Sequence, residues 1–320
     1  MKSMAIGSTE LIQTAIDGIL IGGFFALASV GLSLIFGVQR ILNVAHGAFI
    51  VLASFITIQF SIILTPHLHM DPVYSIILDF IIMSAVGGAA YLLIIYRIEN
   101  TGFEAPLLAT FGLSVFLEYI IEYGLGPIQS MDPSHGIGAT AQNTIISGAP
   151  FTIDGMIFPR ANVLAFGLAI VLVPLLHFFL SRTYLGKAIR ATAQDWTAAE
   201  FSGIDVRRIR FFSFFLGSGL AGVAGGVFAF LQSVIPSLAD TYLLPIILAV
   251  IILGGIGSMI GTLLGGFIVG LLLNFSFLLA LTYLSVLGFQ SDVGSMITFL
   301  VFLAVLMIKP TGIFGRRLSG

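Results

Sequence analysis

The polar segment RTYLGKAIRATAQDWTAAEFSGIDVRRIR, residues 182–210, interrupts a very hydrophobic chain. It holds six of the thirteen Lys and Arg residues and the only tryptophan, Trp196. The whole chain of 320 residues is 58% hydrophobic and 9% charged, with a mean hydropathy of +1.11. A soluble domain carries charge on roughly a quarter of its residues, because its surface must be covered with polar groups. This composition therefore predicts an all-α polytopic membrane protein.

Uncharged stretches long enough to cross about 30 Å of hydrocarbon predict the membrane spans. We expect about 8 to 10 transmembrane helices, with 9 as the best count, in one membrane domain covering residues 1–320. The uncharged stretch 241–291 is too long for one helix, and its LGGIGS sequence (253–258) predicts a turn between two spans. The expected spans are 11–37, 46–65, 73–96, 104–125, 161–181, 211–233, 242–256, 258–281 and 293–309.

The distribution of basic residues predicts the orientation, because short cytoplasmic loops are enriched in Lys and Arg. With segment 182–210 in the cytoplasm, eleven of the thirteen basic residues fall on that side, and only Lys2 and Arg160 fall outside. This arrangement places the N-terminus outside and the C-terminus inside. It also makes 126–160 the largest external segment, in which FTIDGMIF predicts a small hairpin that turns at Asp154–Gly155.

Segment 182–210 is too charged to enter the bilayer, and its pattern predicts two short amphipathic helices joined by a turn. Ala188 and Ile189 lie on the apolar face of the first helix, and the second helix ends near Gly203. One interpretation is an elbow that lies on anionic lipid headgroups. The other is a protrusion that inserts into a cytoplasmic partner, for which Trp196 would be a typical anchor. The residues alone leave both interpretations open.

Small residues recur every four positions in two of the expected spans. This spacing lets helix backbones approach closely in lipid, where the hydrophobic effect does not drive helices together. We expect tight packing within the subunit, and a subunit interface or a sliding translocation surface is the alternative. The residues concerned are Gly217, Gly222, Gly226, Gly257, Gly261 and Gly265.

The sequence RILNVAHG (40–47) gathers polar residues at the junction of the first two spans. One interpretation is a helix N-terminus, where Asn43 or His46 would satisfy backbone donors of the second span. The other is a broken or re-entrant segment in which Asn43, His46 and Gly47 line a translocation path. Irregular backbone is tolerated at membrane depth where it faces protein or water.

Apart from Glu104, which begins a span, four carboxylates lie within the expected spans: Asp17, Asp79, Glu118 and Glu122. A charge deep in the bilayer costs at least about 2.5–3.5 kcal/mol. In the expected topology all four lie in the outer halves of their spans, where they can reach headgroups or line an open mouth. A proton- or ion-coupled secondary transporter would instead use them as a relay, and a role in docking an external protein is a third interpretation.

The chain lacks the phosphate-binding lysine motif of ATPases. None of its three lysines lies in a G-x-x-x-x-G-K-[ST] sequence, and Lys187 follows Gly186 but precedes Ala188. The absence of cysteine excludes thiolate chemistry and Cys-ligated metals. We expect no enzyme activity, cofactor, metal site or nucleic-acid partner in this chain, and His46 is isolated from the other histidines.

Three stretches resemble the permease subunits of branched-chain amino-acid ABC importers, specifically those of the H-type. They are GLSLIFGVQRILNVAHGAFIVLASF (31–55), TYLGKAIRATAQDWTAAEFSGIDVRRIRFFSFFLGSGLAGVAGG (183–226) and VIILGGIGSMIGTLLGGFIVGLLL (250–273), which occur in the order of the family. Within the second stretch, Ala198-Ala199-x-x-x-Gly203 is similar to the coupling-loop signature Glu-Ala-Ala-x-x-x-Gly. Thr197 replaces the glutamate, and the downstream proline is missing.

The resemblance implies a prokaryotic inner-membrane permease that forms half of a translocation path. Its implied partners are a second permease subunit, usually of the M-type, two cytoplasmic ATPase subunits and an external substrate-binding protein. Segment 182–210 would receive the motion of the ATPases. Permeases for urea and short-chain amides look similar and are an alternative. The implied coupling residues are Gly186, Lys187, Arg190, Trp196, Ala198, Ala199, Gly203 and Arg207.

Overall fold

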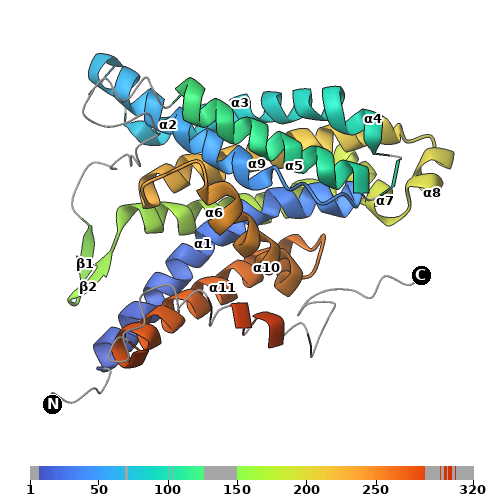
Figure 1. Ribbon diagram of the computed structural model, residues 1–320. Coiled ribbons are helices and arrows are strands. Elements are labelled where there is room, and N and C mark those ends of the chain that lie inside the picture. The colour runs from blue at the N-terminus through green and yellow to red at the C-terminus, as the bar shows by residue number, and fades with distance from the viewer. Residues whose placement is uncertain are drawn as a thin grey trace.

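The computed structural model contains six helices that are long and apolar enough to cross a membrane, with two shorter apolar helices, His46–Ile62 and Ala239–Gly254 (Figure 1). The prediction of an all-α polytopic membrane protein is confirmed. Eight of the predicted spans correspond to these helices, whereas most of the ninth, 293–309, lies outside the described residues and stays a prediction. The structure describes residues 7–68, 71–99, 101–102, 104–125 and 150–284, and positions 296, 299–300, 302–304 and 307.

The first half of the chain forms four apolar helices, two of which end in wider turns. These wider turns, η2 and η3, continue α3 and α5 without a break in the chain direction. The elements are α1 Ser8–Gln39, α2 His46–Leu68, η1 Pro72–Tyr74, α3 Ser75–Ala90, η2 Tyr91–Ile95, α4 Tyr96–Ile98, α5 Glu104–Tyr119 and η3 Ile120–Leu125.

The second half of the described chain begins with a short hairpin and contains the polar segment. The last five residues of 182–210 already belong to α9. The Asp205 side chain starts this helix by accepting a hydrogen bond from Arg208 N. The elements are β1 Phe151–Ile153, β2 Met156–Phe158, α6 Arg160–Arg182, α7 Tyr184–Gln194, α8 Trp196–Phe201, α9 Val206–Leu231, η5 Ala239–Leu243, α10 Leu244–Gly254, α11 Met259–Leu279 and η6 Ala280–Leu284.

Two turns predicted from glycine-containing sequences are confirmed. β1 and β2 pair antiparallel around Asp154 and Gly155, both of which have positive φ. A turn at 255–258 separates α10 from α11, and Gly255 and Gly257 have φ of 86° and 78°. Gly257 was expected among the helix-packing glycines, but it serves the turn, where only glycine adopts this conformation at little cost.

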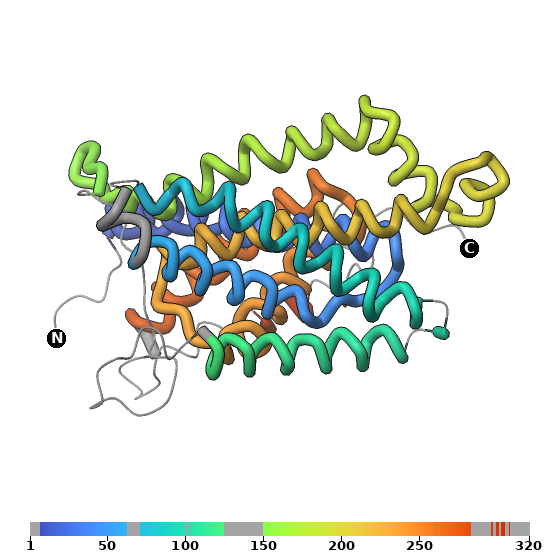
Figure 2. Tube along the Cα trace, turned by 90° about the horizontal axis from the view of Figure 1, so that it is seen from above, coloured from blue at the N-terminus to red at the C-terminus, as the bar shows by residue number. Residues whose placement is uncertain are grey.

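The hairpin and the polar segment lie at opposite ends of the bundle. Figure 2 shows α6 running from the β-hairpin at one end to α7 and α8 at the other. The Gln13 side chain of α1 donates to the carbonyl of Ile157 and accepts from its N–H, so α1 begins at the hairpin end. We call this the outer end and the α7–α8 end the inner end, following the predicted orientation.

The centre of the bundle is a glycine seam, in which α9 packs directly against α1, α2 and α3. A Cβ added at Gly217 would lie 2.7 Å from the Gly31 carbonyl oxygen, and one at Gly222 would lie 2.8 Å from the Asp79 carbonyl carbon. Gly226 likewise leaves room for the Asp79 carboxylate. Gly261 and Gly265 bring α11 against the backbone of α10 in the same manner. The seam residues are Gly31, Gly217, Gly222, Gly225 and Gly226.

Asp79 lies inside this seam. Its side chain is fully buried and accepts a hydrogen bond from the Thr57 hydroxyl, whose oxygen also accepts from Ser75. The expectation that Asp79 reaches headgroups or lines an open mouth is therefore wrong. The physical reason is the space left by Gly222 and Gly226, which lets α3 approach α9 closely enough to enclose the carboxylate.

Candidate coupling surface and translocation path

Helices α7 and α8, residues Tyr184–Phe201, form a compact projection at the inner end, which we call the coupling hairpin. Thr183 caps α7 by accepting a hydrogen bond from Gly186 N at 3.0 Å, and Asp195 caps α8 by accepting from Ala198 N at 3.0 Å. Such caps satisfy the free N–H groups of a helix start. They explain why so short and polar a segment folds into two defined helices.

The base of the coupling hairpin is joined to the bundle by a nearly buried ion pair. Arg210 Nη1 lies 3.0 Å from Glu99 Oε1, and the two side chains are 10% and 5% exposed. Tyr91 donates its hydroxyl to Glu99, and Gln39 Nε2 donates to the Arg210 carbonyl. The guanidinium of Arg210 also lies 4.6 Å from the centre of the Trp196 ring. One arginine thus links α8, the end of α1 and the end of α3–α4.

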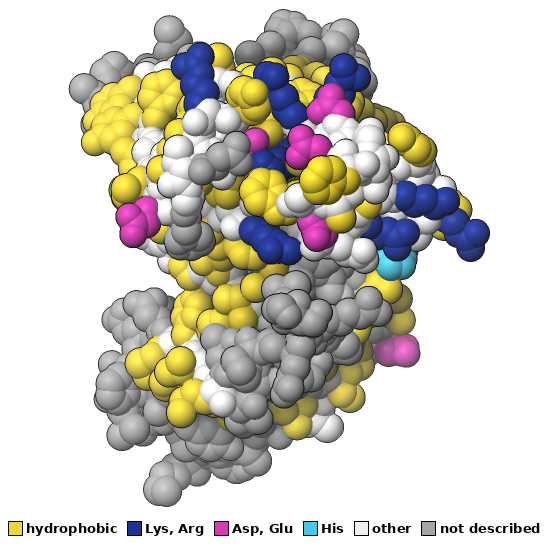
Figure 3. All heavy atoms as spheres, turned by 90° about the vertical axis from the view of Figure 1, so that its right-hand side faces the viewer, with side chains coloured by type: hydrophobic (Ala, Val, Ile, Leu, Met, Phe, Trp, Pro, Cys, Tyr) yellow, Lys and Arg dark blue, Asp and Glu magenta, His cyan; other side chains and the backbone are white. Residues whose placement is uncertain are grey.

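Two further contacts of basic residues surround this base. Arg207 lies over the Tyr96 ring at 3.9 Å, and Arg40 donates to the carbonyl of Gln194 at 3.3 Å. Figure 3 shows Lys and Arg side chains gathered on the face at this end of the molecule. The charge of segment 182–210 is therefore used in part to hold the hairpin on the bundle.

The surface of the coupling hairpin presents large apolar side chains to solvent. Phe201 is 89% exposed and Tyr184 is 85% exposed, whereas Trp196 is 48% exposed because it packs against Arg210. Exposed aromatic side chains on a projection are typical anchors for a partner's groove. Trp196 was the anchor expected from the sequence, and Phe201 and Tyr184 are more available for that role.

The structure brings the other expected coupling residues together on or beside this hairpin. Gly186 lets α7 contact the backbone of Leu180, and the Ala199 side chain is buried. Gly203 has φ of 80°, and no atom lies within 4 Å of the place that a Cβ would take, so it ends α8 for conformational reasons. The exposed members of the set are Lys187, Arg190, Ala198, Gly203 and Arg207.

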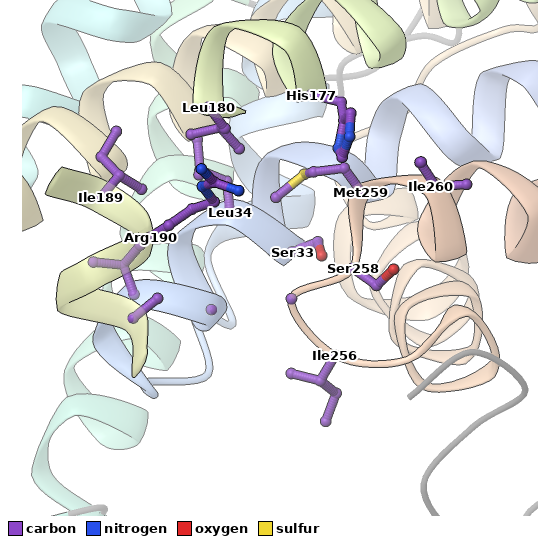
Figure 4. A pocket seen from close by; sticks show the side chains of 14 residues that line it. Ser33, Leu34, His177, Leu180, Ile189, Arg190, Ile256, Ser258, Met259 and Ile260 are labelled. Atoms are coloured by element: carbon purple, nitrogen blue, oxygen red, sulfur yellow. The ribbon is translucent and has the colours of Figure 1, made fainter. Parts of the chain in front are cut away.

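Arg190 also lines a cavity of about 520 Å³ between the coupling hairpin and the ends of α1, α6 and α11. Figure 4 shows Arg190 and His177 among its polar lining side chains, with Ser33 and Ser258. Apart from these, mostly apolar side chains surround the space. The cavity separates part of α7 from the bundle, so the coupling hairpin contacts its support on one side more than on the other.

The segment 40–45 between α1 and α2 is non-helical and folds back into the bundle. His46 Nε2 lies 2.9 Å from the carbonyl oxygen of Ala28. Ala28 precedes Gln39, the last residue of α1, by eleven positions, which corresponds to about 16 Å at 1.5 Å per residue. Helix α2 therefore begins well inside the bundle rather than at its inner surface.

Asn43 and His46 are completely buried at this helix start. Both polar atoms of the Asn43 side chain, and Nδ1 of His46, lack a hydrogen-bond partner among the described residues. The Asn43 side chain is therefore not an N-cap; only its backbone carbonyl accepts a hydrogen bond from His46 N. Buried polar groups without partners are costly, and the geometry agrees with the re-entrant interpretation of 40–47.

A second break in the chain enters the bundle from the outer end. After α9 ends at Leu231, the chain turns back, and η5 begins at Ala239 beside the first turn of α2. The missing side chain of Gly47 allows this contact, since a Cβ there would lie 3.0 Å from the Ala239 carbonyl carbon. Two helix N-termini, one directed outward and one inward, thus meet inside the molecule. Each carries a partial positive charge.

Helix α5 joins both breaks through hydroxyl side chains on one face. Thr110 Oγ1 accepts a hydrogen bond from Val44 N at 3.2 Å, and one turn later Ser114 Oγ donates to Asp240 Oδ1 at 3.0 Å. The Glu118 side chain, one turn further, faces Asp240. The path candidates Asn43, His46 and Gly47 are therefore part of a larger polar region than the sequence indicated.

Sequence reasoning did not find Glu99, Thr110, Ser114 or Asp240. A charged residue at the end of a predicted span is common, so Glu99 gave no special signal. The spacing of Thr110, Ser114 and Glu118 at four residues does mark one polar face of an otherwise apolar helix. That signal could have indicated α5 as a lining helix.

These features are those of a polytopic membrane protein with a short helical projection at one end. The chain belongs to the family described as "Branched-chain amino acid transport system / permease component", which matches residues 14–306. Permeases of this family work in ABC importers and are not themselves enzymes. ATPases and binding proteins are the partners that such an importer implies.

The chain is similar over nearly its full length to several curated relatives. It is 28% identical to "Probable branched-chain amino acid transport permease protein LivH" of Methanocaldococcus jannaschii, over 97% of this chain and 93% of that protein. It is 27% identical to BraD, a high-affinity branched-chain amino acid permease protein of Pseudomonas aeruginosa, over 95% and 96%. It is also 30% identical to the ribose import permease protein RbsC of Bacillus subtilis, over 82% and 74%. No solved structure matches the chain.

Proposed function

We propose that this chain forms half of the translocation path of an importer for branched-chain amino acids and couples that path to cytoplasmic ATPases. The observation that carries this proposal is the coupling hairpin, which exposes Phe201 and Tyr184 at its surface and is joined to three helices through Arg210. The full-length similarity to amino-acid permeases supports the substrate class.

The coupling hairpin transmits motion because its base is directly continuous with membrane helices. α9 follows it after a short connection, and the contacts of Arg210 with Glu99 and Gln39 reach the inner ends of α4 and α1. The glycine seam then holds α1, α3 and α9 backbone to backbone. A displacement of the hairpin by an ATPase would therefore move these three helices together.

The path itself would run beside the paired helix starts at Asn43–Gly47 and Ala239–Asp240. Unwound backbone and half-helix N-termini inside a bundle are the features with which transporters bind polar solutes near the bilayer midplane. Asn43 and His46 supply unpartnered polar atoms at this level. A rigid-body tilt of α1 and α9 would expose them alternately to the two sides.

The assembly we propose contains a second permease subunit of the M-type, two ATPase subunits and an external binding protein. The coupling residues proposed for ATPase contact are Gly186, Lys187, Arg190, Trp196, Ala198, Ala199, Gly203 and Arg207, to which the exposed Phe201 and Tyr184 are added. The β-hairpin at the outer end is a surface for the binding protein, and lipid covers the apolar outer faces.

Uptake by native-membrane vesicles tests this proposal. Vesicles that contain the chain and its co-purifying subunits should accumulate leucine when ATP is supplied inside, and ATPase subunits should be recovered with the chain. Arg190→Glu or Gly203→Val should leave membrane insertion intact and lower leucine uptake relative to ATP hydrolysis. Unchanged uptake in both variants would contradict the coupling role, and uptake of ribose but not leucine would contradict the substrate.

A further inference from the structure

A second cavity, of about 250 Å³, opens toward the outer end of the bundle between α1, α6, α9, η5 and α11. Five polar side chains line it: Asp17, Asn162, Gln232, Tyr242 and Asn274. Each of the five is partly exposed, so the space is reachable from outside these helices. Its volume lies below the roughly 300–1,000 Å³ of pockets for drug-sized ligands, which suits a solute of a few heavy atoms.

Polar and apolar residues occupy different depths of this cavity. Along α1, Asp17 lies toward the outer end, Ile21 is one turn deeper, and Phe24 and Phe25 are two turns deeper, about 10–12 Å from Asp17. The Phe24 ring stacks on Phe228 of α9, with centroids 5.3 Å apart. These rings are almost fully buried and close the space at its deep end, and the accessible apolar lining comes from Ile21 and Leu231.

The remaining polar residues, apart from Tyr242, come from the outer ends of their helices. Asn162 lies in the first turn of α6, Gln232 directly follows α9, and Asn274 lies in the last two turns of α11. Asn274 Nδ2 donates to the Gly270 carbonyl, and its amide oxygen takes no part in that bond. Three amide side chains thus surround the mouth on the walls opposite α1.

Asp17 is held in place by Gln13. Gln13 Nε2 lies 3.1 Å from both carboxylate oxygens of Asp17 and 2.8 Å from the carbonyl oxygen of Ile157 in β2. Since Gln13 contacts both, the position of the Asp17 carboxylate depends on the β-hairpin. A protein that docks on the hairpin therefore acts close to the mouth of the cavity.

We propose that this cavity is an outer subsite for a zwitterionic, aliphatic α-amino acid; this inference rests on the proposed function. The Asp17 carboxylate receives the ammonium group, and the side-chain amides of Asn162 and Gln232 donate to the carboxylate. The aliphatic side chain lies against Ile21 and Leu231. None of the described residues that line this cavity is basic, so an anion without an ammonium group would find no compensating charge among them.

The change from polar residues at the mouth to apolar residues deeper in the cavity favours an aliphatic amino acid over a sugar. A pentose carries hydroxyl groups over its whole outline and would leave some of them unpaired against Ile21 and Leu231, which is costly. An aliphatic amino acid places its polar groups at one end and its apolar group at the other, as the cavity does. The Asp17 carboxylate further favours a ligand with a positive charge.

Cysteine protection tests this subsite without relying on transport. The chain has no native cysteine, so Asn162→Cys introduces its only thiol. In native-membrane vesicles holding the full transporter, leucine should slow the reaction of this thiol with a methanethiosulfonate reagent at least five-fold. Thr9→Cys, an exposed position on the same outer end of α1, is the control and should react at the same rate with and without leucine.

The role of Asp17 is tested in the same assay. Asp17→Asn keeps the size of the side chain and should raise the leucine concentration needed for half-protection at least ten-fold. Glu10→Gln, an exposed change on the same helix, should leave it unchanged. An equal shift in both variants would overturn the assignment of the ammonium group to Asp17.

The outcomes separate this inference from the proposed function. Leucine uptake by unmodified vesicles without protection of Asn162→Cys overturns the subsite and leaves the proposed function intact. Protection by ribose and not by leucine overturns the amino-acid assignment. If leucine protects the thiol in vesicles that show no leucine uptake, the subsite stands and the proposed function fails.

Discussion

The glycine seam and the coupling hairpin are both attached to α9, but by different means. In the seam, glycines such as Gly222 and Gly225 bring α9 against backbone, where an added Cβ would meet the carbonyl groups of Asp79 and Ile50. The coupling hairpin is held by a few long side chains, above all Arg210, and has a cavity of about 520 Å³ behind it. The seam is therefore rigid by its geometry, whereas the hairpin can shift as long as a few polar contacts persist.

This difference fits a protein in which a movement of the coupling hairpin has to move α1, α3 and α9 together. A soft attachment at the seam would let α1, α3 and α9 move separately, and a rigid hairpin could not follow an ATPase. Disruption of these two regions should accordingly have unequal effects on folding. The effects on folded stability should decrease from the seam to the tip of the hairpin.

A leucine in the seam should have the largest effect. Gly222→Leu places a side chain where a Cβ already lies 2.8 Å from the Asp79 carbonyl carbon and from Met83 Cβ. Overpacking costs about 3 kcal/mol or more when the neighbours cannot move, so we expect at least a ten-fold loss of monodisperse protein in detergent. Gly167→Leu on α6 is the control, because no atom of the described residues lies within 4 Å of its Cβ position. Equal recovery of both variants would contradict the rigid seam.

Breaking the ion pair at the base of the hairpin should have the next largest effect. Glu99→Gln leaves the nearly buried Arg210 without a counter-charge, which costs about 3 kcal/mol and should lower the thermal midpoint of the purified chain. The double variant Glu99→Gln/Arg210→Met removes both charges and should recover part of that loss. The single variant Arg210→Met completes the comparison. If the losses of Glu99→Gln and Arg210→Met add up to the loss of the double variant, Glu99 and Arg210 do not act as a pair.

Loss of the ring beside Arg210 should have a smaller effect. Trp196→Ala removes a contact between a guanidinium and an aromatic face, worth about 1 kcal/mol at a partly exposed site. Trp196→Phe keeps a ring in place and should retain more than half of the lost stability. The measurement is the same thermal midpoint, and a full loss in the Phe variant would mean that the indole size, rather than the ring face, matters.

Truncation at the tip of the hairpin should have the smallest effect on stability. Phe201 is 89% exposed, so Phe201→Ala should change the free energy of unfolding by less than about 0.5 kcal/mol. Its effect should appear in association with ATPase subunits, where loss of a central aromatic anchor costs about 2 kcal/mol, roughly thirty-fold in affinity. Glu200→Ala, an exposed neighbour, is the control. Unaltered recovery of ATPase subunits with Phe201→Ala would remove Phe201 from the docking surface.

Much of the fold could be predicted from hydropathy and from a few glycines. Long uncharged stretches located eight helices, and the LGGIGS and Asp154–Gly155 sequences located two turns, because both signals are local. The start of α2 was harder to interpret. Nothing in RILNVA itself says how far the chain runs into the bundle before α2 begins, since that depth depends on contacts with Ala28 and Thr110.

The candidate sites likewise divide into those marked by local sequence signals and those formed by residues far apart in the sequence. The coupling segment stood out because charge is rare in this chain, and its helix caps at Thr183 and Asp195 follow from adjacent residues. The Glu99–Arg210 pair joins residues far apart in the sequence, so composition gave no sign of it. Asp17 was recognised as unusual, but its cavity is formed by five helices and could not be inferred from α1 alone.

The re-entrant segment 40–45 has a consequence for biosynthesis. Its backbone is satisfied partly by Thr110, and its helix start packs against Ala239, both of which leave the ribosome long after it. Because bare peptide groups are not tolerated in lipid, this segment has to wait at the membrane surface until α5 and then η5 have been inserted. The order of synthesis therefore makes the centre of the permease the last part to fold. A chain that stops before η5 cannot form this centre.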